Sequence, residues 1–89
     1  MVETNKRVVQ FALAEPTAKS VVLVGDFNLW SKDATPLQKN ADGVWEVRVP
    51  LTEGAYTYQF IVDGTHWMPD PKADAIDDGF GRKNSVVSL

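Results

Sequence analysis

The 89-residue sequence contains no cysteine and a single histidine, His66. The lack of cysteine excludes a disulfide scaffold and thiolate chemistry. One imidazole without any thiol leaves almost no basis for a zinc site of the usual His/Cys type, so we expect neither a metal nor another cofactor. His66 follows Gly64 and Thr65 in a polar turn, where we interpret it as an exposed turn residue and not as part of a Ser-His-Asp site.

Positive charge is also scarce, because nine Lys and Arg stand against twelve Asp and Glu, for a net charge of -3. Such a balance argues against nucleic acid or an anionic membrane as a partner. No stretch approaches the roughly 20 apolar residues of a membrane helix, and the first residues lack the apolar region of a signal peptide. We therefore expect one soluble, cytoplasmic domain over residues 1–89.

The sequence also lacks the periodicity of an amphipathic helix, and several segments instead alternate apolar and polar residues. The pattern predicts strands over residues 6–15, 20–27, 44–50, 55–62, 66–70 and 84–89, separated by turn signals such as those at 40–43, 52–54 and 63–64. Residues 72–83 are expected to form a polar connection, with at most one short helical turn over 73–78. About seven short strands at this spacing predict an all-β fold, an immunoglobulin-like antiparallel β-sandwich.

The alternation also predicts which side chains form the core, because each strand of a sandwich buries one side. The expected inward-facing residues are Val9, Phe11 and Leu13; Trp45, Val47 and Val49; and Tyr56, Tyr58, Phe60 and Val62. Gln59 should project from the opposite, polar side of its strand.

Enzyme chemistry finds little support in these residues. The carboxylates fall in turns or on predicted solvent faces, not in a cleft that could hold the acid pair of a glycosidase. The acidic residues Asp70, Asp74, Asp77 and Asp78 do not have the spacing of an EF-hand loop, so we interpret them as a solvated segment. Residues 79–81 lack the Gly-Lys-Ser/Thr that would make a P-loop. We expect no catalytic residue.

Two of the three tryptophans occupy unusual positions. Trp30 follows the strand 20–27 and the turn residues after it, and Trp67 follows the turn at 63–66. Two interpretations are open for both: each indole covers one end of the core, or each is a platform on which a flat ligand stacks.

Stacking would suit a sugar. One face of a pyranose carries C–H groups and is slightly positive, whereas the face of an indole is negative and apolar. Amide side chains can both donate to and accept from sugar hydroxyls, and Gln59 and Asn84 are the amides expected nearby. Two indoles at an angle would fit a curved α-1,4-glucan better than flat cellulose.

Several segments resemble one known family. Val-Gly-Asp-Phe-Asn-Leu-Trp (24–30), Gly-Val-Trp-Glu-Val (43–47), Tyr-Thr-Tyr-Gln-Phe-Ile-Val-Asp-Gly (56–64), Asp-Pro (70–71) and Phe-Gly-Arg-Lys-Asn-Ser-Val-Val (80–87) occur in this order. The set is similar to the family-48 carbohydrate-binding module, also called the isoamylase N-terminal or early-set domain. It also resembles the glycogen-binding domain of the AMP-activated protein kinase β subunit.

The resemblance implies an early-set sandwich that binds α-glucans such as glycogen, starch and maltooligosaccharides without cleaving them. By position, Trp30 and Trp67 match the two stacking tryptophans, and Asn84 matches a hydroxyl-binding asparagine. Phe80 falls where the kinase-type domain has a leucine beside the sugar ring, and Gln59 where it has a lysine. The alternative is an accessory domain that docks on a glucan-active enzyme of glycoside hydrolase family 13 type or on a kinase complex.

Overall fold

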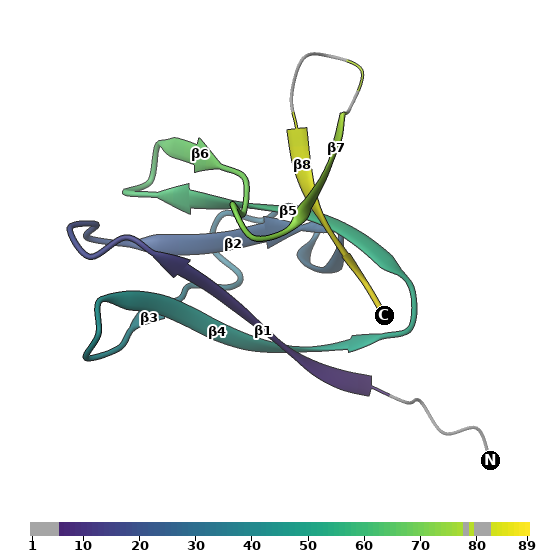
Figure 1. Cartoon of the computed structure of the whole chain (residues 1–89), viewed down its shortest axis with the longest axis horizontal. Coiled ribbons are helices and arrows are strands. Elements are labelled where there is room, and N and C mark those ends of the chain that lie inside the picture. Colours follow the sequence, from purple (N-terminus) through teal and green to yellow (C-terminus); the bar gives the residue numbers. More distant parts are fainter. Residues whose placement is uncertain (1–5, 78, 80–82) are drawn as a thin grey trace.

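Two antiparallel sheets packed face to face make up the computed structural model, which describes residues 6–77, 79 and 83–89 (Figure 1). The first sheet has the order β1 (Lys6–Ala14), β4 (Val44–Thr52) and β3 (Gln38–Lys39). The second has the order β2 (Val21–Gly25), β5 (Ala55–Val62), β8 (Lys83–Ser88) and β7 (Asp74–Asp77), with β6 (His66–Met68) also paired to β5. A 3-10 turn, η1 (Asp26–Asn28), follows β2.

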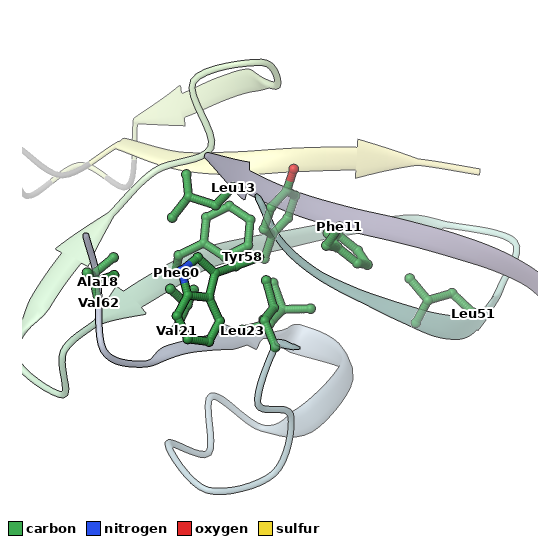
Figure 2. Close-up of a cluster of buried hydrophobic side chains, with 11 residues drawn as sticks. Phe11, Leu13, Ala18, Val21, Leu23, Leu51, Tyr58, Phe60 and Val62 are labelled. Atoms are coloured by element: carbon green, nitrogen blue, oxygen red, sulfur yellow. The ribbon is translucent and has the colours of Figure 1, made fainter. Parts of the chain in front are cut away.

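The core lies between the two sheets (Figure 2). Six of the ten side chains predicted to face inward are buried in it: Phe11, Leu13, Trp45, Tyr58, Phe60 and Val62. The other four are partly buried and pack against it, and Ala18, Val21, Leu23, Leu37 and Leu51 complete the cluster. Leu23 and Phe60 are completely buried, and Phe11 retains 2% of its exposure. Tyr58 packs edge-on against both phenylalanine rings, with centroid distances of 4.9 Å to Phe11 and 6.0 Å to Phe60. Each such side chain contributes about 1.5–3 kcal/mol when it leaves water, so this cluster is the main source of stability.

The predicted all-β sandwich is confirmed, and the predicted strand 55–62 has the same bounds as β5. The prediction for residues 72–83 is wrong, because Asp74–Asp77 forms β7 and not a helical turn in a polar connection. Asp is a poor strand former, but its backbone groups pair with β8 here, in register from Asp74 with Val86 to Asp77 with Lys83. A partner strand therefore overrides the local preference.

A second correction concerns β5, whose outward side was expected to be polar and open. Ile61 and Gln59 both point away from the core, but they keep only 2% and 7% of their exposure. Three other strands, β2, β6 and β8, border β5, and its outward side chains at 59 and 61 are therefore largely shielded. Among the described residues, no helix is long and apolar enough to cross a membrane.

Candidate functional site

The outer face of the second sheet carries four of the five predicted site residues, Trp30, Gln59, Trp67 and Asn84. Side chains of directly paired residues lie on the same side of a sheet, and neighbours along a strand alternate. Tyr58 and Phe60 point into the core, so Gln59 and Ile61 point outward. Trp67 pairs with Ile61 and therefore projects from the same outer face, where it keeps 41% of its exposure.

An amide pair lies next to Trp67 on this face. The Nε2 of Gln59 donates to the Oδ1 of Asn84 at 2.6 Å and approaches the carbonyl of Lys83 at 3.5 Å. An open pocket of about 500 Å³ adjoins the pair, lined by Gln59, Trp67, Pro69 and Lys83. Pro69 and Lys83 were missed by sequence reasoning, because only the pairing of β5 with β6 and β8 brings them beside the other two.

Trp30 reaches the same face from the loop after β2. Its backbone N–H donates to the carbonyl of Gly25 at 2.9 Å, which folds the chain back onto the end of the strand. Leu29 and Trp30 both have a φ of 57°, an unusual left-handed conformation for two successive residues other than glycine. The side chain of Leu29 is left 90% exposed, while that of Trp30 is half-buried.

Asn28 holds this loop in place with three hydrogen bonds. Its Oδ1 accepts from the backbone N–H of Gly25 at 3.0 Å, and its Nδ2 donates to the carbonyl of Leu23 at 2.9 Å and to the Oγ1 of Thr35 at 3.0 Å. The two ends of the loop are thus tied to one amide group. The sequence marks Asn28 only as a turn residue, so this role also escaped prediction.

Asp26 connects Trp30 to β5. One carboxylate oxygen accepts from the indole Nε1 of Trp30 at 3.2 Å, and the other from the backbone N–H and hydroxyl of Thr57 at 2.8 and 2.9 Å. Partial burial opposes ionisation of Asp26, but the bonds from Thr57 and then Trp30 outweigh it, and the pKa of the carboxyl lies below its ordinary value. Asp26 is therefore a charged acceptor at neutral pH.

The two tryptophans attach to the same strand at separate points. Thr57 holds Trp30 through Asp26, and Ile61 pairs with Trp67. At the usual rise of a strand, Thr57 and Ile61 are about 13 Å apart. Gln59 lies midway between them. The loop after Trp30 also reaches Trp67, since the Nζ of Lys32 lies 5.9 Å from the centroid of that ring. Both indoles consequently belong to one face, with the amide pair near its centre.

Residues 9–89 match the family described as the glycogen recognition site of AMP-activated protein kinase. The chain belongs to this family of carbohydrate-binding modules. The module is also similar to a 1,4-alpha-glucan branching enzyme, GlgB, from Prochlorococcus marinus strain NATL1A, with 41% identity over 96 residues that cover 99% of this chain and 12% of that enzyme. The GlgB of Pseudomonas fluorescens strain Pf0-1 is 36% identical over 67 residues, or 74% of this chain and 9% of that enzyme.

The family resemblance inferred from the sequence is thereby confirmed, and the family is a non-catalytic, glycogen-binding one. The module spans only a small part, 8% to 12%, of the branching enzymes that it matches. Any activity of a longer protein is therefore a separate question from what this module binds.

The five predicted ligand-binding residues fall into two groups. Trp30, Trp67, Gln59 and Asn84 lie on the outer face, whereas Phe80 lies outside the described residues. Neither of the two tryptophans belongs to the buried core cluster, in contrast to Trp45, which keeps 9% of its exposure and donates from Nε1 to the carbonyl of Glu15. The contact of these residues with a sugar stays a prediction.

The remaining sequence expectations concern His66 and the acidic residues. His66 is exposed, as expected, although it begins β6 and does not lie within the turn. Over residues 6–77, 79 and 83–89, no cluster of His, Cys, Asp or Glu could hold a metal ion.

Proposed function

We propose that this module binds α-1,4-glucans by stacking glucose units on Trp30 and Trp67, with Gln59 and Asn84 contacting the hydroxyls between them. The observation that supports this most is the shared outer face, on which two partly open indoles flank an amide pair and a pocket of about 500 Å³. Cytoplasmic glycogen or a related storage glucan would be the ligand.

The amide pair suits the edge of a sugar ring. Gln59 is held by its bond to Asn84, so both amides present fixed donor and acceptor atoms and lose little freedom when a ligand arrives. The open pocket exposes any ligand to water, and we therefore expect a weak affinity, roughly micromolar to millimolar.

The test is titration of the module with maltoheptaose, followed by tryptophan fluorescence and calorimetry, together with retention on glycogen. Trp67→Ala should weaken binding about thirtyfold, the effect of losing about 2 kcal/mol at a central aromatic contact. Trp67 is 41% exposed and outside the core, so the variant should remain folded.

Val8→Ala is the matched control, because Val8 is 67% exposed but belongs to β1 in the other sheet. It should bind glycogen and maltoheptaose like the unchanged module. Wild-type affinity in both Trp30→Ala and Trp67→Ala, with the folds intact, would exclude stacking on these rings.

A second candidate function is that of an accessory domain docked on a glucan-active enzyme or kinase. The full-length match of this chain to a segment of branching enzymes favours it. Co-purification with such an enzyme that persists in excess maltoheptaose would support docking through another surface, whereas release by the sugar would assign the contact to the outer face.

A further inference from the structure

Asp26 occupies a position between the most central strand of the outer face and the indole of Trp30. It directly follows β2 and bonds across to Thr57 of β5 through one carboxylate oxygen, which accepts two hydrogen bonds. The other oxygen accepts the indole N–H of Trp30 at 3.2 Å. The carboxylate thus has its own orientation fixed by a strand and faces the only polar atom of the Trp30 side chain.

Trp30 needs such a restraint if it is to act as a platform. It lies outside the core cluster and belongs to a loop in which Leu29 and Trp30 both adopt the left-handed conformation. The backbone bond to Gly25 fixes the main chain but does not itself restrain either side-chain torsion of Trp30. A ring that already has the bound orientation binds more tightly, because less freedom is lost on association.

We propose that Asp26 is a positioning residue for glucan binding: its carboxylate, held by Thr57, sets the plane of the Trp30 indole before the ligand arrives. This inference rests on the proposed stacking role of Trp30 and adds a residue that does not itself contact the sugar. Thr57 serves the same end indirectly by fixing the carboxylate.

The restraint of the Trp30 indole by Asp26 can be tested first without any ligand. The three indole N–H groups should give three NMR signals, and the signal missing in Trp30→Phe would identify that of Trp30. In Asp26→Ala, the Trp30 signal should move upfield and exchange faster with water, while those of Trp45 and Trp67 stay in place. An unchanged Trp30 signal would show that the bond to Asp26 does not hold the ring in solution.

Affinity is then measured with maltoheptaose in a double-mutant cycle. Asp26→Ala should weaken binding about three- to tenfold, the range expected for freeing one large side chain. Phenylalanine has no indole N–H, so in the Trp30→Phe background the bond to Asp26 is already absent. Adding Asp26→Ala to Trp30→Phe should therefore weaken binding by less than about twofold. Thr57→Val, which replaces the hydroxyl by a methyl group and keeps the backbone N–H bond to Asp26, should have an intermediate effect.

Asp63→Ala is the matched control for the loss of a structural carboxylate. Asp63 accepts backbone N–H bonds from Lys19 and Ser20 at 2.6 and 3.1 Å, whereas the indole N–H of Trp30 bonds to Asp26. It should lower the melting temperature without changing the affinity for maltoheptaose.

The outcomes separate the two proposals. If Trp30→Ala weakens binding but Asp26→Ala does not, or if Asp26→Ala weakens it equally with and without the indole, the positioning role is refuted and stacking stands. If Trp30→Ala itself leaves the affinity unchanged, the stacking role of Trp30 fails and the role of Asp26 fails with it.

Discussion

Gly25→Ala should strongly destabilise the module because β2 and β5 approach each other too closely at this residue for a side chain. A Cβ at position 25 would lie 2.6 Å from the carbonyl oxygen of Thr57 and 2.9 Å from the Cβ of Tyr58. Both are fixed parts of β5, so they cannot turn aside as a flexible side chain would. The backbone of Gly25 is extended, with a φ of -175°, so space and not conformation demands glycine here.

The magnitude follows from the shift that the extra carbon would require. The carbonyl of Thr57 would have to recede from 2.6 Å to the ordinary contact distance of about 3.4 Å, which separates two paired strands beside the core. Overpacking of this kind costs about 3 kcal/mol. In a domain of this size, that lowers the melting temperature by about 12–24 °C.

The assay is thermal and urea unfolding followed by circular dichroism, with maltoheptaose titration of the folded fraction. Affinity should fall as well, because Gly25 also bonds to Trp30 and Asn28. Gly64→Ala is the control: a Cβ there meets nothing within 4 Å, and the φ of 78° should cost only about 1 kcal/mol without changing affinity. Equal stability losses in the two variants would refute the close-approach argument.

Three further outcomes are expected. Asn28→Ala should lower the free energy of unfolding by about 2–3 kcal/mol, since three partly buried bonds are lost; a urea-unfolding loss below about 1 kcal/mol would contradict this. Backbone bonds from Lys19 and then Ser20 lower the pKa of Asp63, and the pKa of Asp26 is lowered as well. Both carboxylates therefore stabilise the folded state fully above about pH 4. Urea midpoints should therefore fall as the pH drops further, and this acid dependence should weaken when both are changed to Asn. Burial, followed by the hydrogen bond to Asp70, raises the pKa of Tyr58 above 10.0. The neutral phenol therefore stabilises the folded state below pH 10, and this contribution is lost as the pH rises further. Tyr58→Phe should remove this alkaline dependence of the urea midpoint.

Much of the fold follows from the sequence because the core strands alternate cleanly. In β5, every second residue from Tyr56 to Val62 enters the core or packs against it, as predicted. The segment Asp74–Asp77 was not predicted as a strand, because its aspartates disfavour strands locally and only the pairing with β8 makes it one. Pairing with the strand that follows it decides this element, and the residue types of the segment itself do not indicate that pairing.

The candidate site was predicted only in part for the same reason. Trp30 and Trp67 stand out as tryptophans that lie in or beside turns, so sequence alone suggests them. The burial of Gln59 could not be foreseen, because it depends on the neighbouring strands and on its bond to Asn84. The link from Asp26 to Thr57 likewise joins residues 31 positions apart, and only the antiparallel pairing of β2 with β5 brings them together.

Because β5 borders β2, β6 and β8, the hydrophobic interior and the outer face proposed to bind glucan share one backbone segment. Trp30 is held through Asp26 by Thr57 of β5, and Trp67 pairs with Ile61 of β5, so the outer face should form in the same all-or-none step as folding. Amide hydrogen exchange should accordingly be slowest along β5, and saturating maltoheptaose should slow it further by raising the free energy of global opening.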